Sequence, residues 1–168
     1  MNDHKVHTSE LILNNHKEFV DLVCECWDFH QNIFNEDSTW SYYKYNFFSL
    51  AAPNALAYEL FVELKNLIPD DGKWMQSWIN YHYPDQVLKW HNHDWDYHGY
   101  ISIVPHNTST RFADYEIKNE VGNIYIGPGH RQHEVVVNQR FDTPRITIGF
   151  DVTTHMAPPN NMLSLIPL

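Results

Sequence analysis

The 168-residue sequence predicts a mainly β domain with an N-terminal layer of helices. Helical spacing of apolar residues is confined to residues 1–72, whereas short aromatic and β-branched runs alternate with turns after Gly72, at intervals of roughly ten residues. Aromatic side chains make up 15% of the chain, and such bulky groups suit sheet faces and pocket walls. We therefore expect a single α+β domain with residues 1–72 as helical support, 73–155 as a jelly-roll core and 156–168 as a surface tail.

Two segments of the support have the pattern of amphipathic helices. Asn15 and Glu18 form a capping-box pattern, with Asn15 as the N-cap residue, and predict a helix of about four to five turns. Apolar residues follow at helical spacing: Phe19, Leu22, Val23, Cys26 and Ile33. A second helix is predicted to carry Pro53 in its first turn and to end at the turn-forming residues 69–72. Its apolar face consists of Leu56, Leu60, Leu64 and Leu67.

The remaining segments of the predicted domain are short strands and irregular pieces. Strands are predicted for residues 74–81, 87–93, 100–105, 111–117, 123–126, 133–137 and 145–152. Residues 1–14 form either a loose arm or a short edge strand. The aromatic run 40–48 has no clean period and is expected to be an irregular covering segment. A helical layer followed by such a run of strands is typical of a jelly roll braced by helices.

Charge and composition exclude several classes of partner. The formal net charge is −10, with 11 Lys and Arg against 21 Asp and Glu, which disfavours nucleic acid and anionic membranes. The polar N-terminus has no secretory pattern, and the most apolar stretch, 50–68, contains Pro53 and three charged residues, which excludes a membrane span. Cys24 and Cys26 are expected to be buried thiols in a reducing compartment. These features predict a cytoplasmic protein.

Histidines in two distant segments suggest a metal site. On an extended strand, His91 and His93 point to the same face, and His133 follows a Gly-Pro-Gly turn at the start of a β-branched run. Three imidazoles meeting in one pocket would bind a divalent ion. His130 competes with His133 but lies inside the turn, where it is held less rigidly. In the alternative interpretation, His91 and His93 are ordinary polar side chains on the solvent-facing side of a half-exposed strand.

The motifs around these histidines resemble those of the iron(II)/2-oxoglutarate-dependent oxygenases, whose core is a double-stranded β-helix. In that family, an N-x-Y-x-P strand precedes an H-x-D pair, a distal histidine follows, and R-x-S/T closes the pattern. This chain has Asn-Tyr-His-Tyr-Pro at 80–84, His91, PGHRQH at 128–133 and Arg-Ile-Thr-Ile-Gly-Phe at 145–150. The order and the spacing agree with the family, and the resemblance covers about the last ninety residues.

The resemblance implies a non-haem iron(II) enzyme that uses 2-oxoglutarate and dioxygen to hydroxylate a substrate. His91, His93 and His133 are the implied metal ligands. Arg145 would grip the distal carboxylate of the cosubstrate, because a planar guanidinium binds a carboxylate bidentately. The Thr147 hydroxyl, on the same strand face, would add a hydrogen bond, whereas Ile146, Ile148 and Phe150 would face the opposite layer. Asn80 would hydrogen-bond the 2-oxo acid, although His82 stands where several family members carry Tyr.

The chain departs from the family at the second ligand, where His93 replaces the usual carboxylate. Three interpretations remain open: a neutral three-histidine site, a site in which Asp94 or Asp96 bends back as the carboxylate ligand, and a degenerate site. As non-ligands, Asp94 and Asp96 would orient the imidazoles from outside the metal's coordination sphere.

Two other functional classes compete with the oxygenase. The segment 123–133 also resembles a second cupin motif, which would give a metalloenzyme that does not use 2-oxoglutarate. The first cupin motif, however, expects a Glu a few residues after HxH, where this chain offers only Asp96 and His98. A non-catalytic barrel that serves as a binding or structural module is the third class. Zinc suits three imidazoles but brings no dioxygen chemistry. The expected substrate is a small molecule or a peptide, and nothing in the sequence specifies its identity or an oligomeric state.

Overall fold

The computed structural model describes residues 4–34, 45–155 and 165–168. Its strands form two antiparallel sheets, a six-stranded sheet in the order β1-β6-β3-β8-β2-β9 and a three-stranded sheet in the order β5-β4-β7. The strands are β1 Lys5–Thr8, β2 Trp74–His82, β3 Tyr97–Val104, β4 Thr108–Phe112, β5 Glu116–Lys118, β6 Asn123–Pro128, β7 His133–Val137, β8 Arg145–Thr153 and β9 Ile166–Pro167. The expected mainly β class with antiparallel sheets is confirmed.

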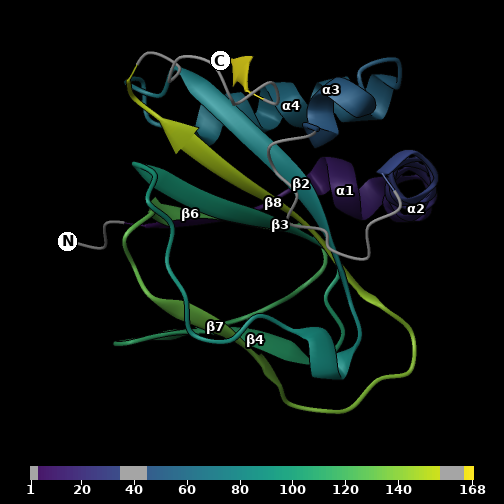
Figure 1. Cartoon of the computed structure of the whole chain (residues 1–168), viewed down its shortest axis with the longest axis vertical. Helices are drawn as coiled ribbons and strands as arrows, with labels where there is room; N and C mark the ends of the chain where they lie inside the picture. The colour runs from purple at the N-terminus through teal and green to yellow at the C-terminus, as the bar shows by residue number, and fades with distance from the viewer. Residues whose placement is uncertain (1–3, 35–44, 156–164) are drawn as a thin grey trace.

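The helices and the small sheet lie on opposite sides of the large sheet (Figure 1). The helices are α1 Glu10–Asn14, α2 His16–Phe34, α3 Phe47–Leu50 and α4 Ala55–Leu67. Their apolar side chains pack on one face of the large sheet and form the main core, which includes Phe19, Val23, Leu60 and Leu64 from the helices and Ile79, Ile101, Ile148 and Phe150 from the strands. Burial of such side chains contributes about 1.5–3 kcal/mol each, so this layer is the main source of the fold's stability.

The central strand β8 carries polar and apolar side chains on opposite faces. Ile146, Ile148 and Phe150 belong to the core under the helices, as the alternation of the sequence predicted. The alternate residues of β8, from 145 to 153, point to the other side, toward the small sheet. Three polar residues of this set, Arg145, Thr147 and Asp151, are 3%, 1% and 0% exposed. A strand buried on both faces with polar groups on one of them indicates a site between the sheets.

The helix α2 begins at His16, directly after Asn15 as predicted, but the N-terminal capping of α2 and of α4 differs from the predictions. The side chain of Asn15 donates to the carbonyl of Leu11, 2.9 Å away, so it closes α1 instead of capping α2, and the predicted capping box is wrong. In α4, Asn54 is the N-cap, with its side-chain oxygen accepting from the N–H groups of Leu56 and Ala57. Pro53 therefore precedes the cap and lies outside the first turn. An Asn side chain satisfies two orphan N–H groups, which proline does not.

Two predicted strands and one predicted irregular segment are also corrected. Residues 87–93 form no ladder and have only an isolated bridge at His91, because this segment crosses from one sheet toward the other. Residues 111–117 include a turn between β4 and β5, closed by a hydrogen bond from Phe112 N to Tyr115 O (2.8 Å). In the aromatic run 40–48, positions 40–44 lie outside the described residues, and 47–48 are helical in α3. The arm contains the edge strand β1, which pairs with β6.

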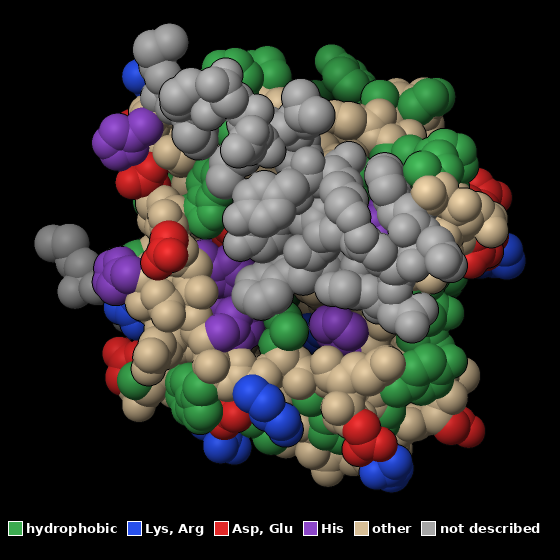
Figure 2. Space-filling model, viewed as in Figure 1, with side chains coloured by type: hydrophobic (Ala, Val, Ile, Leu, Met, Phe, Trp, Pro, Cys, Tyr) green, Lys and Arg blue, Asp and Glu red, His purple; other side chains and the backbone are tan. Residues whose placement is uncertain are grey.

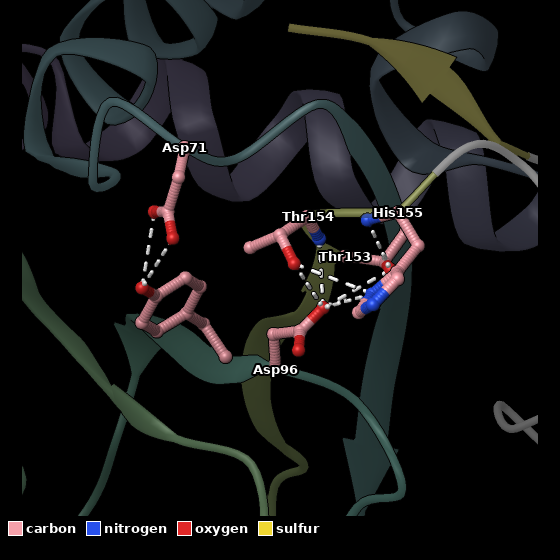
Figure 3. A network of polar contacts seen from close by, with 6 residues as sticks. Asp71, Asp96, Thr153, Thr154 and His155 are labelled. Atoms are coloured by element: carbon pink, nitrogen blue, oxygen red, sulfur yellow. Dashed lines mark hydrogen bonds and ion pairs between the residues drawn. The ribbon is translucent and has the colours of Figure 1, made fainter.

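The start of β3 is joined to the end of β8 by the carboxylate of Asp96 (Figure 3). Its Oδ2 accepts hydrogen bonds from the N–H of Thr154 at 2.7 Å and from the hydroxyls of Thr153 and Thr154 at 3.1 Å. The hydrogen bond from the backbone of Thr154 is the main cause that lowers the pKa of Asp96. Asp96 thus fixes the point at which the crossing segment enters the large sheet.

We expect Asp96→Asn to lower the free energy of unfolding at pH 7 by about 1–2 kcal/mol, because several donors lose a charged acceptor. A carboxyl whose pKa is lowered on folding stabilises the protein above its unfolded-state pKa, and the contribution is lost as pH falls through the folded-state pKa. Urea unfolding at pH 7 and pH 3 should therefore show the difference between variant and wild type shrinking at pH 3. Asp94→Asn, at an exposed neighbour, is the control, and an equal difference at both pH values would contradict this role.

Candidate metal centre

Backbone hydrogen bonds hold two histidine-bearing segments against each other between the sheets. His91 and His133 form an antiparallel bridge, with His91 N to His133 O at 3.0 Å and His133 N to His91 O at 2.9 Å. The N–H of His93 donates to the carbonyl of Gly129 at 2.9 Å. His133 opens β7 of the small sheet, so two residues 42 positions apart in the sequence share a fixed register. Figure 2 shows histidine side chains at several separate places on the face turned to the viewer.

The side chains of His91, His93 and His133 converge as the sequence predicted. One ring nitrogen from each lies within 4.8 Å of the others. The ring centroids are 4.3 Å apart for His91 and His133, 5.3 Å for His91 and His93, and 5.5 Å for His93 and His133. His93 and His133 are each 5% exposed. A set of three buried nitrogens this close together fits one divalent ion with imidazole ligands.

A hydrogen bond at Nδ1 orients each of these imidazoles. Nδ1 of His91 lies 2.6 Å from the carbonyl of Lys89, and Nδ1 of His133 lies 3.1 Å from the carbonyl of Arg131. Nδ1 of His93 lies 3.0 Å from Oδ2 of Asp151. Because carbonyl and carboxylate oxygens accept, each Nδ1 must carry the proton, which puts the lone pair on Nε2. An outer partner that fixes the tautomer in this way is characteristic of metal-binding histidines.

Burial lowers the pKa of two of the three converging imidazoles, His91 and His133. Burial, with a smaller contribution from His98, lowers the pKa of His133 to about 2. Burial is also the main cause that lowers the pKa of His91, and it lowers the pKa of His98 well below its usual value. Only a neutral imidazole binds a metal ion. The rings of His91 and His133 are therefore in the protonation state that ligation requires.

The structure adds two buried residues that the sequence interpretation missed as parts of this centre, His98 and Asp151. Nδ1 of His98 lies 2.9 Å from Oδ1 of Asp151, while the other carboxylate oxygen contacts His93. Together with His93 they form a second cluster with ligand atoms within 4.8 Å. The sequence did contain a pattern that could have identified Asp151. This residue lies six positions after Arg145 on the same strand, so the alternation of side chains puts both on one face. The pairing that brings His98 opposite Asp151 could not be read from the sequence.

The alternative ligands considered from the sequence lie away from the histidine cluster. Asp96 is held by Thr153 and Thr154, and Asp94 is exposed. His130 is also exposed, at the turn before β7. Neither aspartate joins a cluster of ligand atoms within the described residues. The carboxylate nearest to the imidazoles is that of Asp151, which approaches His93 from its Nδ1 side.

Arg145, Thr147 and Asn80 line the same cavity as the three histidines. Asn80 Nδ2 donates to the hydroxyl oxygen of Thr147 at 3.2 Å, and Arg145 Nη1 lies 3.4 Å from that oxygen. Among the described residues Arg145 forms no ion pair, and its buried Nε has no hydrogen-bond partner. Burial lowers the pKa of Arg145 to about 10, so it remains charged at neutral pH. A buried cation without a counter-ion is costly, and an anionic ligand would offset that cost.

The enclosed space between these side chains is small. Its volume is about 30 Å³, above the roughly 10–15 Å³ that a single water molecule needs. Other walls are formed by Trp78, Leu88, Tyr100, Thr110 and Val135. The cavity thus accommodates an ion with one or two waters, and a dicarboxylic acid requires side chains such as Leu88 to move aside.

Comparison with known proteins gives a likeness of fold. No family model and no curated protein matches the sequence. A solved structure described as "Non-heme monooxygenase, ThoJ-Ni complex" superposes with a TM-score of 0.52 at 13% sequence identity, and the match covers 90% of this chain and 71% of that chain. At this identity, the likeness concerns the arrangement of sheets and helices. Within the described residues, no helix is both long and apolar enough to cross a membrane.

Gly129 permits the close approach of the two segments that carry the histidines. A Cβ at this position would overlap the carbonyl oxygen of Trp95 and lie 3.2 Å from the carbonyl oxygen of His93. Both neighbours are backbone atoms, so no side-chain rotation relieves the overlap. We expect Gly129→Ala to push the 93–95 segment away and to lower Ni(II) affinity by about 10-fold, with a loss of roughly 1–3 kcal/mol in stability.

Isothermal titration with Ni(II) and chemical unfolding measure these two effects. Gln132→Ala, at an exposed position of the same turn, is the matched control and should change neither. An unchanged Ni(II) affinity in folded Gly129→Ala would show that His93 does not depend on this contact.

Proposed function

We propose that the protein is a non-haem iron(II)- and 2-oxoglutarate-dependent oxygenase that hydroxylates a small molecule or a peptide. The observation that carries this proposal is the meeting, in one cavity, of three converging imidazoles and a buried guanidinium that forms no ion pair with any described residue. The three imidazoles fit a divalent metal ion, and the guanidinium fits an organic anion. The fold likeness to a non-haem monooxygenase supports the same class.

His91, His93 and His133 are the residues that would hold the metal. When bound, iron(II) supplies the activation of dioxygen that hydroxylation needs. Imidazole ligands carry no negative charge, so they would not compensate the positive charge of the ion, and an anionic chelator would be favoured beside it. The three Nδ1 hydrogen bonds keep the rings in place, and burial excludes bulk water from their Nε2 side.

Arg145 would bind the distal carboxylate of the 2-oxo acid. Its guanidinium offers parallel N–H donors to a carboxylate. The Thr147 oxygen already accepts from Asn80 and Arg145, so its O–H is the donor that remains for a ligand. His82 faces Arg145 in the strand register, and burial, with the nearby Arg145 charge, lowers its pKa to about 4. Neutral His82 therefore adds no second cation to the site.

The proposal also includes the finer features expected from the sequence. The two facing sheets would be the halves of a jelly roll of the double-stranded β-helix type, in a single domain. Residues 156–164 of the expected surface tail lie outside the described residues. The free thiols of Cys24 and Cys26 and the net charge of −10 support a cytoplasmic enzyme that does not act on nucleic acid or membranes.

A second candidate is a metalloenzyme of the same fold that does not use 2-oxoglutarate. The small volume of the cavity, about 30 Å³, favours this alternative. In that case Arg145 would bind the anionic group of the substrate itself. The two candidates differ in whether 2-oxoglutarate is converted to succinate.

His133→Ala should lower the affinity for Fe(II) or Ni(II) by more than about 100-fold, because it removes a ligand and not merely a group that orients one. Anaerobic titration of the metal-free protein, with circular dichroism to verify folding, measures the change. His130→Ala, three residues earlier and exposed, is the matched control and should bind as the wild type does. Equal affinities of the two variants would rule out the proposed ligand set.

Arg145→Gln should weaken binding of 2-oxoglutarate to the Ni(II)-loaded protein by about 100-fold or more, since the lost partner of a buried charge pair is worth about 3–5 kcal/mol. Metal affinity should change little. Arg140→Gln, at an exposed arginine paired with Asp85, is the control. Iron-dependent formation of succinate by the wild type tests the reaction. Metal binding with no affinity for 2-oxoglutarate would favour the second candidate.

A further inference from the structure

The carboxylate of Asp151 is shared between two histidines, only one of which belongs to the proposed ligand set. Its Oδ2 lies 3.0 Å from Nδ1 of His93, and its Oδ1 lies 2.9 Å from Nδ1 of His98. The carboxylate is completely buried, and the side chains of His93 and His98 are 3% and 7% exposed. Each oxygen therefore serves one ring, and no bulk water competes for either contact.

The two rings lie face to face. Their centroids are 3.7 Å apart with an angle of 13° between the planes, and the ring of His98 is also 4.8 Å from that of His133. His98 and Asp151 are directly opposite each other on β3 and β8. The strand register therefore fixes the position of the carboxylate, and the stack fixes the orientation of both imidazoles relative to it.

We propose that Asp151 is a positioning residue that sets the tautomers of His93 and His98 together, and so presents Nε2 of His93 to the metal. This inference rests on the proposed metal site. An ionised carboxylate only accepts, so both rings must carry their proton on Nδ1. His98 acts as the second donor that keeps the carboxylate in place, without being a ligand of the ion.

Because one carboxylate accepts from two rings, replacing Asp151 by asparagine affects both His93 and His98. An asparagine at 151 offers one oxygen and one NH₂ group, so it cannot accept from both rings. One ring must change its tautomer or lose its hydrogen bond. If His93 faces the NH₂ group, its proton moves to Nε2, the nitrogen that the metal needs.

The test is a double-mutant cycle of Asp151→Asn and His98→Phe with Ni(II) affinity as the readout. In the wild-type background, Asp151→Asn should lower the affinity by about 10–100-fold. In the His98→Phe background, the amide oxygen is available to His93 alone, so the same substitution should cost less than about 3-fold. Equal losses in the two backgrounds would overturn the proposal, since they would mean that Asp151 acts by its charge alone.

A second measurement uses the wild-type protein and does not depend on its enzymatic activity. Long-range ¹H–¹⁵N correlation spectra of the metal-free wild type should show the Nδ1–H tautomer for both His93 and His98. In the Zn(II)-loaded protein, His93 should keep its Nδ1 proton. Loss of that proton on loading would show that the ion binds the alternative set His93, His98 and Asp151, and would overturn the role of Asp151 as a positioning residue.

The metal titrations and the NMR spectra distinguish a failure of this proposal from a failure of the proposed function. Absence of Ni(II) and Fe(II) binding would refute the metal site but leave the tautomer prediction to be decided by the spectra. An Nε2–H tautomer at His93 in the metal-free protein would refute the role of Asp151, whether or not the protein is an oxygenase. Circular dichroism of each variant verifies that a loss of affinity is not a loss of fold.

Discussion

The alternation of side chains along β8 is the constraint on which the rest of the structure depends. One face of the strand gives the apolar residues that pack under the helices, and the other face carries Arg145, Thr147 and Asp151 into the space between the sheets. A register shift of one residue would exchange the two faces. Pairing with β2 on one side and β3 on the other fixes that register, so the core and the site are specified by the same hydrogen bonds.

The same strand places two buried charges of opposite sign far from each other. Arg145 and Asp151 are six residues apart, which on a strand amounts to about 20 Å. They are therefore too distant to form an ion pair, and each has to be stabilised locally. Asp151 accepts from two imidazoles, whereas the side-chain hydrogen bond that Arg145 forms within the described part of the chain is the long one to Thr147. This difference is the physical basis for assigning a structural role to Asp151 and an anion-binding role to Arg145.

Between these charges, hydrogen bonds from outside the cluster hold the histidine rings in place. The Nδ1 partners of the three converging imidazoles are two backbone carbonyls and the Asp151 carboxylate. Burial lowers the pKa of His91 and His133, which lowers the competition between protons and a metal ion at these two rings. The isolated bridge between His91 and His133 and the contact at Gly129 then fix the distance between the two segments. A metal site of this kind is preorganised by backbone geometry, and it loses little conformational entropy on binding.

The sequence by itself determined the fold class, most strand positions and the helical pattern, because these follow from local periodicity and turn chemistry. It also singled out His91, His93 and His133, which the structure brings together, and Arg145, Thr147 and Asn80, which line the same cavity. Tertiary structure alone decided the environment of the carboxylates: Asp96 turns to Thr154, and Asp151 meets His93 and His98. Such contacts depend on strand register and on the path of the irregular 87–96 segment, which are set by pairing between residues distant in sequence, where local patterns carry no information.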